Sequence, residues 1–282
     1  MDQLSPIGRL QRVLVATDGS EYSVGAVQVA IAMCVKGGAS LTAMTAVISA
    51  GDLDGTVAAD AQAELEARAS AVVDEVQAQA MRSGIECDKV VRFGDDPYQE
   101  ILAESEHVNA DMIVVGRRGK RGLARLMLGD ATLKVIGNAK CSVMVVPKAA
   151  GMWTKRVLLA TDGSRSADAA AVLAARISQC CGTPITVLSV EVPSHSPQRQ
   201  AEAWPTVKRV AEFLANEGAT VDAVVERGEP HHVIIDTARA KGADLIVMGS
   251  HGRTGLGRLL LGSNSERVIG QATCPVLVVK GT

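Results

Sequence analysis

Aromatic side chains are almost absent from this chain of 282 residues. Phe, Tyr and Trp together make up 2% of the sequence, so the chain lacks the rings on which proteins stack single-stranded nucleic acid. An excess of one charge is missing as well, because 29 basic and 31 acidic residues leave a formal net charge of -2. No overall field attracts nucleic acid or an anionic membrane, and we expect neither as a partner.

Long hydrophobic runs and paired cysteines are also lacking. No segment approaches the roughly 18–20 apolar residues of a membrane span, and the first ten residues hold no apolar core of signal-peptide length. The six cysteines include no C-x-x-C pair. The adjacent Cys180 and Cys181 could be redox-active, but reduced and mostly buried thiols are the simpler interpretation. We therefore expect a cytoplasmic protein.

Two common nucleotide-binding motifs do not occur. The sequence has no G-x-x-x-x-G-K-[ST] motif, because Gly119 and Lys120 are followed by Arg121. No G-x-G-x-x-G motif follows the first predicted strand either. Both absences disfavour a P-loop NTPase and a nicotinamide-dependent dehydrogenase.

The chain contains an internal repeat, in which three sequence blocks each occur twice. RVLVATDGS, ADMIVVGRRG and CSVMVVPK, which begin at residues 12, 110 and 141, recur as RVLLATDGS, ADLIVMGSHG and CPVLVVKG from residues 156, 243 and 274. Their shared order indicates a tandem duplication. It predicts one domain over residues 1–149 and a second over residues 153–282, with the seam near KAAGMWTK.

Each copy alternates short apolar runs with helical patterns. In the first copy the expected strands cover residues 12–17, 40–47, 85–93, 111–116 and 142–147, and the expected helices run from Ser20 as a cap to about residue 36, over 58–83, from Pro97 and over 128–138. Continuous apolar strands separated by helices indicate parallel pairing with both sheet faces covered. We expect two tandem doubly wound α/β domains, whose ligands bind at the carboxyl ends of the strands.

A glycine-rich loop follows the fourth strand of each copy. In the second copy it contains Gly249, Gly252 and Gly262, and a helix is expected to begin near the last of these. Glycine lets the backbone approach a ligand closely, and a helix start presents free N–H groups and the positive end of its dipole. The side chains that could add donors or positive charge are Ser263, Ser265, Arg253, Arg258 and His251. The pattern predicts a cradle for phosphate oxygens; the alternative is an ordinary strand–helix connection in which Ser263 is only an N-cap.

With these blocks in view, both halves resemble the universal stress protein family over nearly the whole chain. Nucleotide-binding members carry glycine, two residues, glycine, nine residues, then glycine and serine or threonine, and Gly249, Gly252, Gly262 and Ser263 satisfy this pattern. ATDGS at the first strand and CPVLVV at the last add to the match. The resemblance implies five-stranded parallel sheets of the adenine nucleotide alpha-hydrolase-like, Rossmann-like type, with ATP over the first and fourth strands.

The resemblance also implies which residues hold the nucleotide. Asp162 is the acidic residue expected near the adenosine and any Mg²⁺, although an Asp-Gly turn that stabilises its own backbone is an alternative reading of it. The residues expected along the adenosine are Ala160, Thr161, Val190 and Met248. Those expected at the ribose and phosphates are Gly249, Gly252, Gly262, Ser263 and Ser265, with Arg253 adding charge. No metal is expected beyond Mg²⁺ carried with the nucleotide.

The first copy departs from the pattern at one position. It keeps Asp18, Gly116, Gly119, Gly129 and Thr132 but has Asp130 where the second copy has Ser263. An aspartate at a helix start gains about 0.3–1 kcal/mol from the dipole. Beside one phosphate charge at about 4 Å, it costs roughly 1 kcal/mol in water and roughly 4 kcal/mol at an effective dielectric of 20. We expect the first site to bind ATP much more weakly than the second, or not at all.

Five cationic side chains lie in the same loop, so other outcomes for ATP binding at the first site are open. The five side chains are Arg117, Arg118, Lys120, Arg121 and Arg125. These cations could offset the negative charge of Asp130, one arginine could pair with Asp130, or Mg²⁺ could bridge Asp130 to a phosphate. A solvated basic loop, a different anionic ligand and an acidic protein partner are further alternatives.

Three functions are compatible with the sequence. The first is an ATP-binding stress-response or signalling protein with little turnover. The second is a slow ATPase or autophosphorylating protein, with Ser263 and Ser265 as acceptors and His251 as the nearest candidate base. The third is an interaction protein that needs no nucleotide. Because family dimers associate through the closing strands, we expect an intrachain pseudo-dimer, and a homodimer stays possible.

Overall fold

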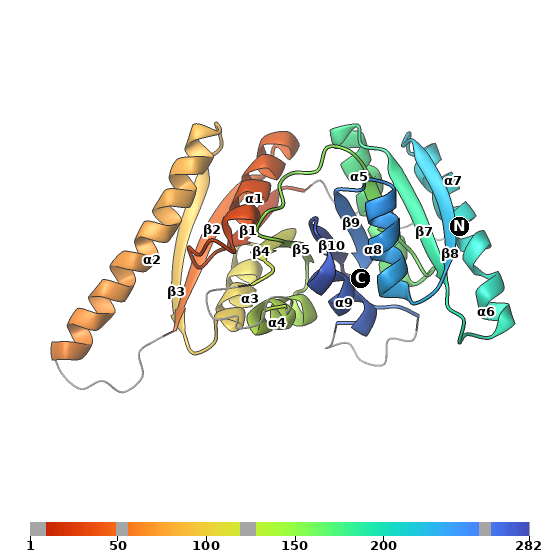
Figure 1. Cartoon of the computed structure of the whole chain (residues 1–282). Coiled ribbons are helices and arrows are strands. Elements are labelled where there is room, and N and C mark those ends of the chain that lie inside the picture. Colours follow the sequence, from red (N-terminus) through yellow and green to blue (C-terminus); the bar gives the residue numbers. More distant parts are fainter. Residues whose placement is uncertain (1–9, 49–55, 119–127, 254–260, 282) are drawn as a thin grey trace. The chain divides into compact units, whose positions relative to one another are not determined.

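A computed structural model describes residues 10–48, 56–118, 128–253 and 261–281 (Figure 1). The described chain separates into two compact units, an N-terminal unit within residues 10–149 and a C-terminal unit within residues 150–281. Gly119, Lys120, Arg121, Arg125 and Arg258, which figured in the sequence predictions, lie outside the described residues. In the described residues, no helix has both the length and the apolar character needed to cross a membrane.

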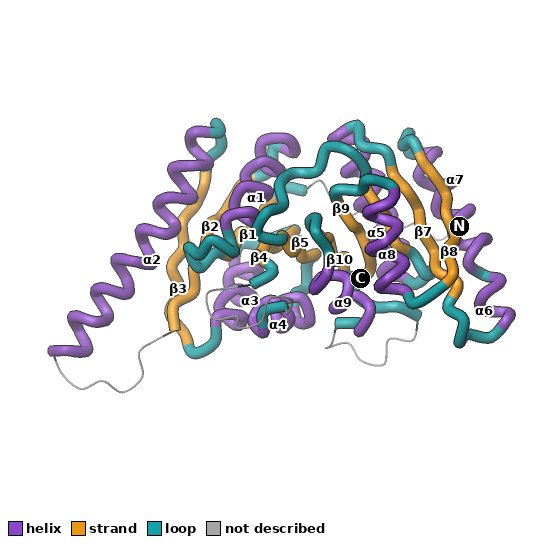
Figure 2. The backbone as a smooth tube through the Cα atoms, viewed as in Figure 1, coloured by secondary structure: helices purple, strands orange, loops and turns teal. Residues whose placement is uncertain are grey.

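The N-terminal unit alternates strands and helices along the chain. Its elements are β1 (Arg12–Ala16), α1 (Val24–Gly37), β2 (Ser40–Ile48), α2 (Thr56–Arg82), β3 (Cys87–Gly94), α3 (Pro97–His107), β4 (Met112–Gly116), α4 (Asp130–Asn138) and β5 (Ser142–Val146). Its strands are parallel in the order β3-β2-β1-β4-β5. Figure 2 shows the alternation of helices and strands.

Helices cover both faces of this sheet. The successive residues Val13, Leu14 and Val15 of β1 point to opposite faces, yet each is at most 1% exposed. Helix α1 contacts α2, and α3 contacts α4, so the four helices form two packed pairs around the strands. β1 is therefore a central strand of a doubly wound sheet, because an all-parallel sheet is normally covered on both faces.

The C-terminal unit repeats this plan with one addition. Its elements are β6 (Val157–Ala160), α5 (Arg165–Cys181), β7 (Ile185–Glu191), α6 (Pro197–Ala201), α7 (Ala203–Asn216), β8 (Val221–Arg227), α8 (Pro230–Ala240), β9 (Leu245–Gly249), α9 (Ser263–Gln271) and β10 (Val276–Val279). The parallel order is β10-β9-β6-β7-β8. Where the N-terminal unit has the single helix α2, the C-terminal unit has the short helix α6 followed by α7. The predicted fold class, two tandem doubly wound α/β units, is confirmed.

The first helix of each unit begins differently. Ser164 caps α5, because its side chain accepts a hydrogen bond from the backbone N–H of Ala167. The expectation that Ser20 caps α1 is wrong: α1 begins at Val24, and the hydroxyl of Ser20 donates to Oδ1 of Asp18 at 2.5 Å. The carboxylate of Asp18, two residues earlier, accepts the hydroxyl proton of Ser20 within the turn. The hydroxyl is therefore used in the turn and does not cap α1, which begins four residues later.

Strand order creates a switch point in each unit. In the C-terminal unit the chain runs from β6 outward to β7 and β8, then crosses back to place β9 on the other side of β6. Ala160 at the end of β6 lies opposite Leu188 of β7 and Met248 of β9. Connections leave the sheet in opposite directions here, which opens a crevice outside the carboxyl ends of β6 and β9.

Candidate functional site

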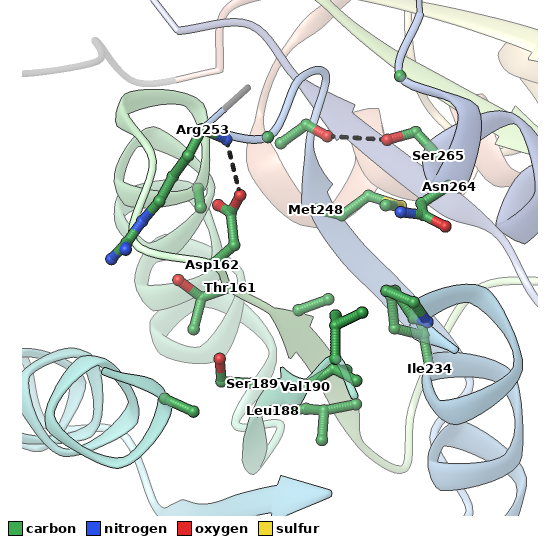
Figure 3. Close-up of a pocket in the computed structure, with 18 of the residues that line it drawn as sticks. Thr161, Asp162, Leu188, Ser189, Val190, Ile234, Met248, Arg253, Asn264 and Ser265 are labelled. Carbon is green, nitrogen blue, oxygen red and sulfur yellow. Dashed lines mark hydrogen bonds between the residues drawn. The ribbon is translucent and has the colours of Figure 1, made fainter. Parts of the chain in front are cut away.

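A cavity of about 510 Å³ lies at this switch point, within the range of about 300–1,000 Å³ typical of small-molecule sites. Apart from Arg258, which lies outside the described residues, the residues that the sequence analysis placed in the C-terminal site line it, including Ala160, Thr161, Asp162, Val190, Met248, Gly249, Gly252, Arg253, Gly262, Ser263 and Ser265. In the view of Figure 3, Asp162, Arg253 and Ser265 lie toward one end of the cavity, and Leu188, Val190 and Ile234 lie toward the other. The end nearer the glycine loop is therefore polar, whereas the other end is largely apolar, with Ser189 beside Val190 (Figure 3).

Asp162 fastens the end of β6 to the glycine loop after β9. Its Oδ1 accepts the backbone N–H of Ser164 at 3.0 Å, which is the Asp-Gly turn that the sequence suggested. Its Oδ2 accepts the backbone N–H of Arg253 at 2.9 Å, across 91 residues of sequence (Figure 3). The carboxylate thus sets the position of the loop as well as that of its own turn.

The glycines of the loop are needed for close packing. A Cβ on Gly252 would lie 2.8 Å from Oδ2 of Asp162, and a Cβ on Gly249 would overlap Oγ of Ser166. The hydroxyl of Ser166 in turn donates to the carbonyl of His251 at 2.5 Å, which ties α5 to the loop. A larger residue at 249 or 252 would push the loop away from β6 and α5.

Gly262 differs from the other two glycines. It is the N-cap of α9 with a φ of -61°, and a Cβ there would meet its nearest neighbour at 3.5 Å, an ordinary contact. A side chain at this position would fit the protein alone. Because glycine offers no capping group, the first-turn N–H groups of α9 face the cavity without a side-chain cap.

The two predicted serines have different roles. Ser265 is 5% exposed, and its hydroxyl donates to the carbonyl of Gly249 at 3.3 Å. Thr132 makes the same contact with Gly116 at 3.1 Å in the N-terminal unit, so this hydroxyl joins the helix to the strand in both units. Ser263 is exposed at the first position of α9 and is the hydroxyl better placed to reach a ligand.

An ion pair crosses the cavity. The guanidinium of Arg253 pairs with the carboxylate of Glu202, which lies at the junction of α6 and α7. Both residues line the cavity. The pair sets a positive and a negative group beside the glycine loop, and an anion bound there would compete with Glu202 for Arg253.

Sequence reasoning missed part of the lining. The missed residues include Leu188, Ser189, Arg199, Glu202, Thr206, Ile234 and Asn264. Ile234 could have been found, because it follows Pro230 by one turn of the predicted helix. Glu202 and Arg199 had no signal, because they come from α6 and the start of α7, where the two copies differ most.

The N-terminal unit has a cavity of about 880 Å³ at the equivalent place. Asp18, Gly116, Gly129 and Thr132 line it, whereas the predicted Gly119 lies outside the described residues. Asp130 also lines it, but its side chain is 80% exposed and pairs with Lys134 at 2.9 Å. The partner is a lysine one turn along α4, because that spacing places the two side chains on the same face of the helix.

Comparison with known proteins identifies the family. A sequence model described as the universal stress protein family matches residues 9–147 and 154–280. The chain belongs to the universal stress protein family. Both of its units match, so it is a tandem member.

Individual universal stress proteins resemble the chain in sequence and fold. One from Mycolicibacterium smegmatis is 34% identical over 185 residues, which cover 61% of this chain and 62% of that protein. A shorter one from Thermus aquaticus is 36% identical over 137 residues, which cover 45% of this chain and 98% of that protein. The chain thus spans less than two thirds of the length of the first relative. A crystal structure of a universal stress protein from Archaeoglobus fulgidus covers 98% of this chain with a TM-score of 0.80 and 26% identity.

Proposed function

We propose that this universal stress protein binds ATP in its C-terminal unit and acts as a nucleotide-dependent stress-response module with little or no turnover. One observation carries the proposal. The glycine loop, the uncapped start of α9 and an apolar wall meet in a single cavity at the strand switch point. A nucleotide has the matching parts, a flat apolar base at one end and phosphates at the other.

The proposed placement follows the chemistry of the wall. Leu188, Val190 and Ile234 would contact the adenine, because these apolar side chains gather at the end away from the loop (Figure 3). The N–H groups of the first turn of α9 would bind phosphate oxygens, together with the hydroxyl of Ser263. Arg253 would turn from Glu202 to the phosphates, since an arginine prefers two oxygens of a doubly charged group to one exposed carboxylate.

Mg²⁺ fits this site only in company with the nucleotide. Among the described residues, no group of three or more His, Cys, Asp or Glu side chains converges to hold a metal ion. Asp162 is a carboxylate beside the glycine loop, and each of its oxygens already accepts one backbone N–H. Mg²⁺ is commonly held by one or two carboxylates, substrate phosphates and water, so the phosphates would supply most of its ligands.

Autophosphorylation is the second candidate, and it is favoured by one observation. Ser263 is exposed at the start of α9, whereas Ser265 is buried and donates to Gly249. If a serine of this loop accepts a phosphoryl group, we expect Ser263 to accept it. Incubation with ATP followed by peptide mass spectrometry would locate the modified residue, and a phosphate on Ser265 would contradict this assignment.

A matched pair of glycine variants tests ATP binding. Gly262→Asp places a carboxylate where the phosphates would lie, and we expect the variant to fold because a Cβ at Gly262 makes only ordinary contacts, the nearest at 3.5 Å. Gly129→Asp makes the same change in the N-terminal unit, where a Cβ would also make only ordinary contacts, the nearest at 3.6 Å. In calorimetric titrations with Mg²⁺ and ATP, we expect one site in the parent and in Gly129→Asp and none in Gly262→Asp. Unchanged binding by folded Gly262→Asp would refute the proposed site.

The organisation of the whole chain is part of the proposal. The first domain, residues 1–149, would carry the degenerate phosphate loop, and the second, residues 153–282, the complete motif. The intrachain pseudo-dimer, a homodimer and a cytoplasmic location stay predictions. Light scattering coupled to gel filtration would measure the number of chains per particle.

A further inference from the structure

The lining of the N-terminal cavity differs from that of its counterpart in a consistent way. The strand registers make Ala16 and Met44 equivalent to Ala160 and Leu188. The buried stripe of α2 repeats in α7 134 positions later: Ala69, Val73, Val76 and Ala80 match Ala203, Val207, Val210 and Leu214. These two alignments allow the walls of the cavities to be compared residue by residue.

Three polar lining residues of the C-terminal cavity are apolar in the N-terminal cavity. Leu65 stands in place of Arg199, Val72 in place of Thr206, and Ala131 in place of Asn264. Ile48 of β2 and Ile101 of α3 add to the apolar lining, whereas Arg68 of α2, which pairs with Glu64, is a charged lining residue between Leu65 and Val72 in sequence. The apolar part of this lining favours an apolar body over a ribose or a phosphate chain.

The same cavity is also lined by a buried cation. Arg118 takes the position that His251 has in the C-terminal unit, and its Nη2 atom is buried. Its Cα lies 3.6 Å from where a Cβ on Gly129 would be, so the arginine lies beside the start of α4. Burial also lowers the pKa of the neighbouring Arg117, and the charge of Arg118 lowers it further. An anion at this place would relieve the proximity of two guanidinium groups.

The carboxylates of this cavity are already engaged, with one exception at the rim. Asp18 accepts hydrogen bonds from the backbone N–H and the hydroxyl of Ser20. Asp96 accepts the N–H of Tyr98 at the start of α3, and Asp96 and Asp130 share Lys134 at 3.3 and 2.9 Å. Asp95 is exposed. The repulsion from Asp130 grows with the charge of the ligand, so one negative charge is tolerated where the several charges of ATP are not.

We infer that the N-terminal cavity binds a small amphiphilic acid, with its apolar body against Leu65 and Val72 and its single anionic group beside Arg118. A fatty or aromatic carboxylic acid has this chemistry. The chain would then carry two sites of different specificity built on one duplicated fold. This inference does not depend on ATP binding by the C-terminal unit.

Two fluorescent probes of similar size test the inference on the full chain. Anilinonaphthalene sulfonate carries one negative charge, and N-phenyl-1-naphthylamine carries none; both brighten in apolar sites. We expect saturable binding of the anionic probe at one site per chain, displaced by decanoate and unaffected by ATP. Displacement by ATP but not by decanoate would overturn the inference.

Matched variants locate the probe. Leu65→Glu should abolish saturable binding of both probes, whereas Arg199→Glu, the same change at the equivalent C-terminal position, should leave it unchanged. Arg118→Gln should weaken the affinity for the anionic probe about tenfold, the loss expected for one charge-assisted hydrogen bond. The affinity for the neutral probe should change less than twofold. Loss of binding in Arg199→Glu, or equal effects of Arg118→Gln on both probes, would refute the assignment. If Leu65→Glu shows no cooperative melting, the two-probe comparison in Arg118→Gln decides alone.

Discussion

The natural difference between the two units, a serine against an aspartate at the start of the phosphate-loop helix, can be transferred to the C-terminal site. We predict that Ser263→Asp weakens ATP binding without destabilising the protein. Position 263 is exposed at the first turn of α9, and Arg267 lies four residues later, as Lys134 lies four residues after Asp130. The variant therefore reproduces the local surroundings of the N-terminal helix.

The size of the effect follows from charge and exposure. Two like charges about 4 Å apart repel by roughly 1 kcal/mol in water and roughly 4 kcal/mol at an effective dielectric of 20. The equivalent Asp130 is 80% exposed, which places the repulsion near the water value, at about 1–2 kcal/mol, or about five- to thirtyfold in affinity. In the absence of ATP the new carboxylate should stabilise the helix start by about 0.3–1 kcal/mol.

The assay compares ATP with adenosine in the parent, Ser263→Asp and Ser263→Asn. We expect Ser263→Asp to lose affinity for ATP but not for adenosine, and the loss to shrink with added salt because the charges are exposed. The uncharged Ser263→Asn controls for the lost hydroxyl. Equal losses in the two variants, or ATP affinity within twofold of the parent in Ser263→Asp, would refute the electrostatic reasoning.

Three further predictions concern the loop, a histidine and the thiols. Gly252→Ala should weaken ATP binding about tenfold, because its Cβ would lie 2.8 Å from Oδ2 of Asp162 and would break a charge-assisted bond to the loop; unchanged calorimetric affinity would contradict this. The pKa of His231 is lowered by burial and then by neighbouring positive charges, so the unfolded chain binds more protons and stability falls as the pH drops below about 6.5. His231→Asn should flatten the decline of the melting temperature between pH 7 and pH 5, and parallel curves would show that another group is responsible. Burial raises the pKa of Cys34 to about 12, whereas Cys180 is exposed. At pH 8 a disulfide reagent should therefore react with Cys180 first, and Cys180→Ser should remove the fast phase; a fast phase that persists would place it elsewhere.

The sequence predicted the fold well because the signals were redundant. Most strands appeared twice as an apolar run, and several helix starts were marked by a proline or a glycine, such as Pro97 of α3 and Gly129 before α4. The cap at Ser20 was the clear error. The same DGS triplet occurs in both units, and only tertiary context decides that Ser164 caps a helix while Ser20 bonds to Asp18.

The candidate site was predicted where the chain is repeated and missed where it is not. Motif residues such as Gly249 and Asp162 converge on the cavity because parallel strands end at the same edge of the sheet. Glu202 and Arg199 could not be found, because they lie in α6 and at the break between α6 and α7, where the first copy has one continuous helix. The role of Asp162 as a loop anchor was also hidden, because it depends on a bond to Arg253 across 91 residues.

We propose that one of the two units, the C-terminal one, holds an adenine nucleotide. The most direct measurement is to saturate the purified protein with Mg²⁺ and ATP, remove free nucleotide, denature the protein and quantify the released nucleotide per chain by chromatography and mass spectrometry. We predict about one adenine nucleotide per chain in the parent and none in Gly262→Asp. Two per chain would show that the N-terminal site accepts ATP despite Asp130, and none in the parent would contradict ATP binding altogether.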